Sequence, residues 1–392
     1  MAYTGSYQSQ VFGNGGSPYP FGAAELEEAA RVKLSPEAFD YIAGAAGRGL
    51  TARANAAAFS RYGLTYRVLH QDIPTDPAVT ILGTSLALPV LLAPAGVADL
   101  AHPEAEAGAA RGAAEVGTSL VLSAVTSSPL EDVAAAAPSG HPWFQLAWSR
   151  DERLARSLVH RAEKAGYEAI VLMGDCYAAG WRPRELSHAF FPYRHGHGLG
   201  NYYSDPRFWA LAGHTPSGPG LPDDAAREAA VAVWNQVFTR PSFAPGDLAT
   251  LKSWTDLPIL VKGVCDPSEA RCLVEAGADG IVVSNHGGRQ LDNGVAALDC
   301  LPAVCAAVAG RVPVLFDSGI RTGTDVLIAL ALGADAVMIG RPWLYGLALG
   351  GADGVAHVLR SLKDEFTSAL TLTGHHTCAT LSLSDLTPAG PQ

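Results

Sequence analysis

The sequence has little of what a membrane protein or a nucleic-acid-binding protein needs. It contains no run of about 18 apolar residues, the length that a membrane-spanning helix requires. The first residues are polar and carry neither the positive segment nor the apolar core of a secretory signal. Lys and Arg number 27 against 38 Asp and Glu, a formal net charge of −11, and no basic cluster stands out. We therefore expect a cytoplasmic protein that binds neither nucleic acid nor membrane.

Cysteine is scarce, and its spacing excludes two kinds of site. None of the six cysteines forms a Cys-x-x-Cys pair, so we predict no disulfide framework and no cysteine zinc site. Cys300 and Cys305 lie in an Ala/Val-rich stretch and are expected to be buried structural thiols on a helix. The His-Gly-His-Gly stretch at 195–198 could suggest a metal, but no carboxylate or cysteine is spaced to complete a site. We favour solvated loop histidines and predict no metal.

What the sequence does contain is a repeat of short apolar segments and alanine-rich helical stretches. Eight segments read as buried strands: Pro89–Leu92, Leu120–Ser123, Trp143–Leu146, Ala169–Leu172, Pro258–Val261, Gly280–Val283, Pro313–Phe316 and Ala336–Ile339. Helical stretches separate most of them, such as Pro103–Val116, Glu152–Ala165, Pro267–Ala276 and Thr324–Leu332. Eight strand–helix units in about 250 residues are typical of a (β/α)8 TIM barrel, an α/β fold. A doubly wound open sheet is the alternative, but no Gly-x-Gly-x-x-Gly follows the first strand.

An arm precedes the repeat, and one insertion interrupts it. We expect residues 1–70 to form an N-terminal arm and helices that pack on a barrel of residues 71–392. The first 22 or so residues are expected to be extended, and residues 23–46 to be helical. Residues 187–247, between the fourth and fifth strands, are rich in Pro, Gly, His and aromatic residues. A loop of this length is usually a lid or disordered, so we predict a lid insertion over the active-site face.

One stretch carries most of the chemical signal: Ser-Asn-His-Gly-Gly-Arg-Gln-Leu-Asp at 284–292, directly after the apolar run 280–283. It places a titratable base, His286, and a cation, Arg289, at the end of a strand. The two glycines between them allow a sharp turn and a close approach to a flat ligand. The alternative is a helix N-cap followed by an ordinary glycine turn.

Other polar residues follow the remaining strands, at the barrel end where catalysis takes place. After the seventh and eighth strands stand Gly319 with Arg321 and Gly340 with Arg341, a pattern typical of a phosphate site, although both arginines could be surface residues. Lys262 ends the fifth strand, either as a buried ion-pair partner or as a cation facing developing negative charge.

Two further residues, Asp175 and Arg182, complete the predicted chemistry. Asp175 could orient His286, and Arg182 with Arg289 could hold a carboxylate. Together these positions indicate an enzyme that binds a phosphate-bearing cofactor and oxidises a small carboxylate.

With these residues in place, the sequence resembles the FMN-dependent α-hydroxy acid oxidases and dehydrogenases, and within them most of all lactate 2-monooxygenase and its relatives. The motifs that carry the resemblance are Ser-Asn-His-Gly-Gly-Arg-Gln at 284–290, Gly-Trp-Arg-Pro-Arg at 180–184 and Leu-Phe-Asp-Ser-Gly-Ile-Arg-Thr-Gly at 315–323. The resemblance runs from about residue 7 to about residue 372.

The resemblance implies oxidation of a small 2-hydroxy carboxylate to a 2-oxo acid, or its oxidative decarboxylation, with FMN as cofactor and O2 as acceptor. The catalytic residues it implies are His286 as base, Asp175 beside it, Lys262 near the flavin, and Arg182, Arg289 and Tyr41 on the substrate carboxylate. The FMN-binding residues it implies are Pro94, Ala95, Gly96, Ser123, Gln145, Lys262, Ser284, Asp317, Gly319, Arg321, Gly340 and Arg341. It further implies a homotetramer or homo-octamer. Oxidase, monooxygenase and dehydrogenase stay open, as do hydride and carbanion mechanisms.

Three positions depart from the family pattern. Ala147 stands where the family has a tyrosine that faces the substrate, Met173 stands where it usually has a threonine, and the loop after Ser123 is one residue shorter. Either the pocket is enlarged for a bulkier acid or biosynthetic intermediate, or the protein binds FMN without turnover. We favour the enlarged pocket, because the base and both arginines are retained. A non-oxidative barrel enzyme with a phosphorylated substrate is a further alternative.

Overall fold

The computed structural model describes residues 5–68, 74–214 and 222–389. Its centre is one sheet of eight parallel strands in the order β4-β11-β10-β9-β8-β7-β6-β5, and a parallel bridge between Leu92 and Leu120 brings the two edge strands together. The strands are β4 (Val90–Leu92), β5 (Val121–Leu122), β6 (Trp143–Leu146), β7 (Ile170–Met173), β8 (Ile259–Val264), β9 (Gly280–Val283), β10 (Val314–Phe316) and β11 (Ala336–Ile339). The predicted (β/α)8 barrel is confirmed, and the doubly wound alternative is wrong.

Strand residues alternate between the inside and the outside of the barrel, as the two-residue period of a strand requires. The inner cluster contains residues from every strand, among them Leu91, Val121, Trp143, Val171, Leu260, Val282, Leu315 and Met338. Ile81 and Leu86 of the hairpin β2 (Val79–Ile81) and β3 (Thr84–Leu86) join this cluster. Because Trp143 Nε1 also donates to Thr84 Oγ1 at 2.9 Å, the hairpin closes the amino-terminal end of the barrel.

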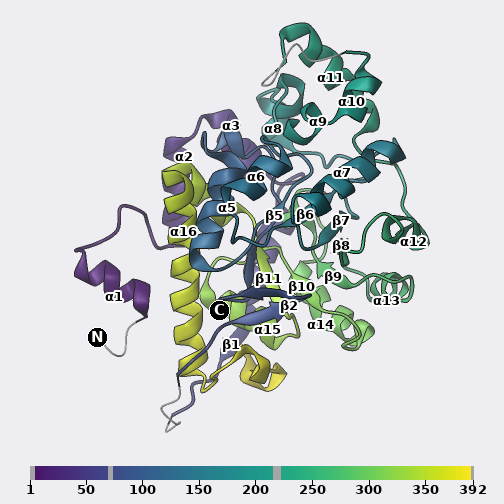
Figure 1. The fold of residues 1–392 in the computed structure, drawn as a ribbon. Coiled ribbons are helices and arrows are strands. Elements are labelled where there is room, and N and C mark those ends of the chain that lie inside the picture. Colours follow the sequence, from purple (N-terminus) through teal and green to yellow (C-terminus); the bar gives the residue numbers. More distant parts are fainter. Residues whose placement is uncertain (1–4, 69–73, 215–221, 390–392) are drawn as a thin grey trace.

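Helices surround the barrel and bury the outward-facing strand residues in a second cluster (Figure 1). They are α5 (Ala105–Val116), α6 (Leu130–Ala136), α7 (Glu152–Lys164), α12 (Asp247–Lys252), α13 (Pro267–Glu275), α14 (Ala297–Val308), α15 (Gly323–Ala331) and α16 (Arg341–Leu372), the last broken at Gly350–Gly351. Cys300 and Cys305 lie on α14 as predicted, but both are only half-buried. Within the described ranges, no helix has the length and apolarity to cross a lipid bilayer.

The amino-terminal region is more helical than predicted. Residues 6–13 form a helix, α1 (Ser6–Gly13), which lies on the outer side of α16 in Figure 1 and contacts it through Tyr7 Oη and His357 Nδ1, 2.7 Å apart. The helix predicted over 23–46 is two helices, α2 (Ala23–Lys33) and α3 (Pro36–Ala43), because Leu34 is extended and Ser35 caps a new helix start. The remaining elements at the two ends are α4 (Leu50–Ala57), η1 (Ala58–Arg61), η5 (Cys378–Thr380), η6 (Leu383–Asp385) and the antiparallel pair β1 (Tyr62–Leu64) and β12 (Leu386–Pro388). The expected domain boundary at 70/71 lies outside the described residues.

The insertion between β7 and β8 is also mainly helical, rather than the long loop that its composition suggests. Its elements are α8 (Pro183–Ser187), η3 (Pro192–His195), α9 (Gly200–Tyr203), α10 (Pro206–Ala212) and α11 (Asp224–Val237), with residues 215–221 not described. Figure 1 shows these helices gathered beyond one end of the barrel. A buried ion pair, Arg161 Nη1 to Asp205 Oδ2 at 3.1 Å, ties the insertion to α7.

Candidate active site

A cavity of about 390 Å³ lies at the carboxyl ends of the strands, where the fold predicts catalysis. Nearly every residue predicted for the site lines it: Tyr41, Pro94, Ala95, Gly96, Ser123, Gln145, Arg182, Lys262, His286, Arg289, Asp317, Gly319, Arg321, Gly340 and Arg341. The two exceptions, Asp175 and Ser284, lie one layer behind the lining, where they contact His286 and Lys262. The fold thus brings together the residues that the sequence assigned to separate strand ends.

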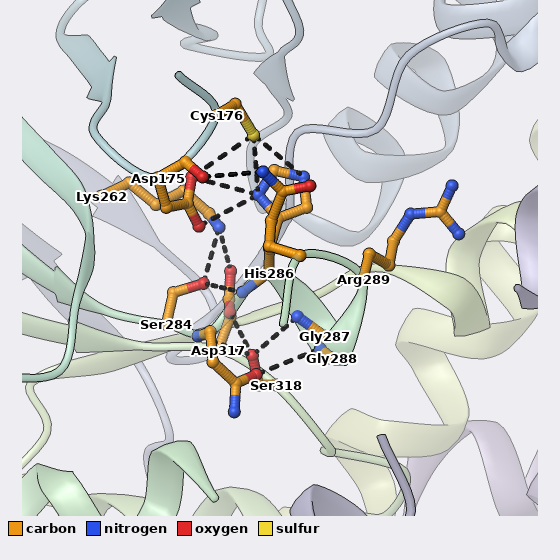
Figure 2. Close-up of polar contacts among 12 residues, drawn as sticks. Asp175, Cys176, Lys262, Ser284, His286, Gly287, Gly288, Arg289, Asp317 and Ser318 are labelled. Atoms are coloured by element: carbon orange, nitrogen blue, oxygen red, sulfur yellow. Dashed lines mark hydrogen bonds and ion pairs between the residues drawn. The ribbon is translucent and has the colours of Figure 1, made fainter. Parts of the chain in front are cut away.

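His286 opens a short turn, η4 (His286–Gly288), directly after β9. Its φ is 57°, a left-handed conformation that non-glycine residues seldom adopt and that is often found at functional sites. Gly288 has a φ of 74°, and an added Cβ would lie 2.5 Å from the backbone nitrogen of Ala52, so only glycine fits there. The turn leaves His286 Nδ1 3.1 Å from Asp175 Oδ2 (Figure 2).

Asp175 is an ionised partner for this histidine. Burial alone would raise the pKa of its carboxyl, but the charge and hydrogen bond of His286, aided by Lys262, outweigh burial and lower the pKa to about 2. The carboxylate packs against a bulge in β8, where a Cβ added to Gly263 would lie 2.6 Å from Asp175 Cβ. Asp175 therefore carries a full negative charge beside the imidazole at every pH at which the protein is expected to work.

Lys262 combines the two roles that the sequence left open. Its Nζ lies 2.7 Å from Asp317 Oδ2 and 2.8 Å from Ser284 Oγ, and its side chain is almost fully buried. Burial alone would lower the pKa of the ammonium, but Asp317 and then Asp175 outweigh it and raise the pKa above its usual value. Lys262 is thus a permanent cation held by a buried ion pair, and it also lines the cavity.

The two predicted clamp arginines share one carboxylate that the sequence did not reveal. Glu185 Oε1 lies 3.2 Å from Arg182 Nη1 and 3.2 Å from Arg289 Nη2. Arg289 Nη1 also donates to the carbonyl oxygens of Tyr41 (2.8 Å) and Gly44 (2.9 Å). Two guanidinium groups and one carboxylate leave one positive charge unbalanced at the cavity wall, which suits a carboxylate ligand.

The cavity floor between β10 and β11 is cationic. Among the described residues, neither Arg321 nor Arg341 has a carboxylate partner within ion-pair distance. Burial, and then repulsion from Arg289, lowers the pKa of Arg341 to about 10, the effect expected for a buried cation without a counter-ion. A Cβ added to Gly340 would meet nothing within 4 Å, so the backbone there is open to a ligand. These features fit a phosphate group.

A second unsatisfied group points to a polar, planar ligand next to the phosphate. Gln145, on β6, is buried and lines the cavity, and its Nε2 has no hydrogen-bond partner among the described residues. Buried amide donors without a partner are costly, so a ligand acceptor is expected at this position. The residues present therefore fit the phosphate and the polar ring of FMN.

Several residues at the site were not predicted from the sequence. Cys176 Sγ lies 3.5 Å from His286 Nδ1 and 3.6 Å from Asp175 Oδ1, and burial, followed by Asp175, raises its pKa well above the usual value, so it is a neutral thiol. The insertion supplies an aromatic wall that consists of Phe191, Tyr193, Trp234 and Phe238. A search for aromatic residues in the insertion at 187–247 could have found this wall, although not its geometry.

The two substituted residues that depart from the family pattern lie in different places. Met173 lines the cavity, at the end of β7. Ala147 is fully buried and is not part of the lining.

The histidines of the 195–198 stretch are not a pair: His197 Nδ1 lies 2.6 Å from Asp99 Oδ2, whereas His195 stacks on Phe190. The expectation of solvated loop histidines is therefore wrong for His197, which is half-buried and joined to the barrel.

Comparison with known proteins agrees with this site. The family profile described as FMN-dependent dehydrogenase matches residues 30–388. An L-lactate oxidase of Lysinibacillus sphaericus is 41% identical over 358 residues, which is 91% of this chain and 90% of that protein. A 4-hydroxymandelate oxidase of Amycolatopsis orientalis is 41% identical over 354 residues, 90% of this chain and 94% of that protein.

Solved structures give the same result. A crystal structure of mandelate oxidase superposes with a TM-score of 0.79 at 36% identity and covers 94% of this chain and 98% of its own. These matches rule out the alternative of a non-oxidative barrel enzyme with a phosphorylated substrate. The chain belongs to the family of FMN-dependent dehydrogenases, with FMN as its cofactor.

Proposed function

We propose that this protein oxidises a 2-hydroxy acid to the 2-oxo acid, with O2 as the acceptor and hydrogen peroxide as the second product. One observation carries the proposal: His286, with Asp175 behind it, and an arginine pair with one excess positive charge face the same cavity. A base and a carboxylate clamp at one site are what the oxidation of a hydroxy carboxylate requires. In the overall reaction the substrate loses two protons and two electrons, and O2 gains both.

In this proposal, Arg182 and Arg289 bind the substrate carboxylate and thereby fix the hydroxyl-bearing carbon near His286. Because Nδ1 of His286 faces Asp175, the proton is accepted at Nε2, and the aspartate stabilises the imidazolium that forms. Bound FMN supplies the two-electron acceptor. Lys262, held by Asp317, places a fixed positive charge where negative charge develops.

The aromatic wall of the insertion favours a substrate with a bulky or aromatic side chain. Phe191, Tyr193, Trp234 and Phe238 line the cavity together with Met173, and a large apolar group gains more from such a surface than the methyl group of lactate does. The similarity to 4-hydroxymandelate oxidase and to mandelate oxidase supports this choice. Lactate is the second candidate, supported by the similarity to L-lactate oxidase.

Product analysis separates the oxidase from the monooxygenase that the sequence resemblance also implied. We expect one mole of hydrogen peroxide and one mole of 2-oxo acid per mole of O2 consumed, with mandelate turned over faster than lactate. Carbon dioxide and a shortened acid, without peroxide, would establish the monooxygenase instead. A protein that keeps FMN but consumes no O2 with any acid would be the non-catalytic FMN binder.

A further inference from the structure

A second tyrosine hydroxyl lies at the carboxylate clamp, and it comes from the insertion rather than from the barrel. Tyr193, on η3, has its Oη 2.8 Å from the Oη of Tyr41, on α3, although the two residues are 152 positions apart. Both side chains line the cavity. Burial raises the pKa of both phenols, so both remain protonated at neutral pH.

Counting protons shows what this pair can do. Two phenols carry two hydrogens, and their mutual hydrogen bond uses only one of them. Tyr41 is the member closer to the clamp: its carbonyl accepts from Arg289, and that guanidinium lies 5.3 Å from the centre of its ring. The hydrogen left over is therefore best placed for a carboxylate at the arginines when Tyr193 donates and Tyr41 accepts.

Contacts within the insertion hold Tyr193 in this position. Its ring stacks on Trp234 of α11, with the ring centres 4.6 Å apart and the planes at 19°. Phe191 packs edge-on at 5.0 Å. Gly198 lies against the other side, where an added Cβ would be 3.0 Å from Tyr193 Cε1.

The His-Gly-His-Gly stretch therefore has a structural purpose next to this tyrosine. Gly198 gives the ring space, and His197 joins the insertion to the loop after β4 through its 2.6 Å contact with Asp99. Ser127 Oγ donates to the other oxygen of Asp99 at 2.8 Å and fixes the carboxylate.

We propose that Tyr193 is a positioning residue for substrate binding: it donates to Tyr41 and so directs the Tyr41 hydroxyl at the substrate carboxylate that Arg182 and Arg289 hold. This inference rests on the proposed function, since it needs a carboxylate at the clamp. Its consequence is that the insertion controls affinity for the acid without touching the base. Two linked hydroxyls polarise each other, so losing the first weakens the second.

A double-mutant cycle with an unreactive ligand tests the proposal. The ligand is benzoylformate, with oxalate as a smaller carboxylate, and binding is followed through the perturbation of the oxidised flavin spectrum. We expect Tyr193→Phe to raise the Kd roughly 5- to 20-fold, the effect of one hydrogen bond, and Tyr41→Phe to raise it at least as much. Because Tyr193 acts through Tyr41, the double variant should bind no more weakly than Tyr41→Phe alone.

Tyr203→Phe is the matched control, since Tyr203 lies in the same insertion and its hydroxyl donates to the Gly196 carbonyl oxygen, outside the cavity lining. It should leave the Kd unchanged. In turnover, Tyr193→Phe should raise KM with little change in kcat, because the carboxylate contact is equal in ground state and transition state. An unchanged Kd in Tyr193→Phe, or additive effects in the double variant, would overturn the proposal.

A second experiment tests the role of Tyr193 without changing Tyr193 itself. His197→Gln alters the contact with Asp99 that anchors the segment beside Tyr193. It should weaken benzoylformate binding two- to threefold in the wild-type background but not in Tyr41→Phe. An equal loss in both backgrounds would contradict the role of Tyr193. A wild-type protein that binds neither ligand would instead refute the proposed function, and with it this inference.

Discussion

At the scale of single residues, the site is a set of buried charges of which some are balanced and others are not. Lys262 is balanced by Asp317, and His286 faces Asp175. The arginine pair shares one glutamate, and among the described residues Arg341 has no carboxylate partner at all. Balanced groups keep the barrel mouth folded, whereas unbalanced cations provide affinity for anions.

The first prediction concerns the clamp. Arg289→Met should lower kcat/KM for the best 2-hydroxy acid about 10²- to 10³-fold, because two charge-assisted hydrogen bonds to the carboxylate are lost. The protein should remain yellow, since FMN is held elsewhere. Arg184→Met is the control, because that arginine is more than half exposed and, within the part of the chain that the structure describes, its one ion pair is with Asp40. Rapid flavin reduction in Arg289→Met would show that this arginine does not bind substrate.

A second residue-scale prediction concerns folding stability. Lys262→Met leaves Asp317 buried without its cation and should lower the free energy of unfolding by about 3–5 kcal/mol. The comparison is Lys252→Met, which breaks a pair with Asp279 whose side chains are 39% and 33% exposed and should cost at most about 1 kcal/mol. Urea unfolding of the holoenzymes measures both. Equal losses would mean that the buried pair does not stabilise the barrel mouth.

At the scale of elements, the insertion between β7 and β8 adds side chains to the cavity that the barrel alone does not supply. Its helices supply the aromatic wall, and the contacts that attach them include the Arg161–Asp205 ion pair, the His197–Asp99 and His188–Asp40 pairs and the hydrogen bond between Tyr193 and Tyr41. The His197–Asp99 pair contains a group with a raised pKa that titrates near neutral pH, which makes the attachment pH-dependent.

The third prediction follows from the signs of these pKa shifts. The hydrogen bond to Asp99 raises the pKa of His197, so the stability it contributes is complete below about pH 6.5 and is lost as pH rises through the raised value. Burial alone would raise the pKa of the Asp99 carboxyl, but the hydrogen bond with His197 outweighs burial and lowers that pKa. The stability that ionised Asp99 contributes is therefore present above about pH 4 and is lost as pH falls. Protease cleavage within 187–247 should therefore be slowest between about pH 4 and 6.5 and faster at pH 9.

The control for this pH dependence is His197→Gln, which cannot titrate. Its cleavage rate, corrected for the protease's own pH profile, should differ less between pH 6 and pH 9 than that of the wild-type protein, in which only the His197–Asp99 pair is added. A wild-type protein that shows no difference between these two values would contradict the assignment of the His197–Asp99 pair as the titrating anchor.

The barrel strands were predictable from sequence, and the insertion was not, for a physical reason. Buried parallel strands are short apolar runs, and all eight follow that pattern, so their carboxyl ends and the residues just after them could be read directly. The insertion helices are short, and tertiary contacts such as Trp209 Nε1 to the Tyr203 carbonyl oxygen hold them, so their composition resembles a loop. Tyr193 and the link from Glu185 to Arg289 were missed because the partners, Tyr41 and Arg289, are distant in the sequence.

At the scale of the whole molecule, a protein with a net charge of −11 keeps a group of cations at one end of its barrel. Six Arg and Lys side chains line the cavity that the insertion helps to enclose: Arg150, Arg182, Lys262, Arg289, Arg321 and Arg341. Such a cavity concentrates anions, and the proposed function would place two of them there, the FMN phosphate and a substrate carboxylate. The proposed reaction requires both at once.

Anaerobic mixing of the purified holoenzyme with a series of 2-hydroxy acids, from lactate to mandelate and larger, tests this account most directly. The signal is loss of the visible flavin absorbance, with the corresponding 2-oxo acid as product. We predict complete bleaching by at least one acid, fastest with a bulky or aromatic side chain, and none in Arg289→Met. A yellow protein that no acid in the series bleaches would contradict the proposed oxidation of 2-hydroxy acids.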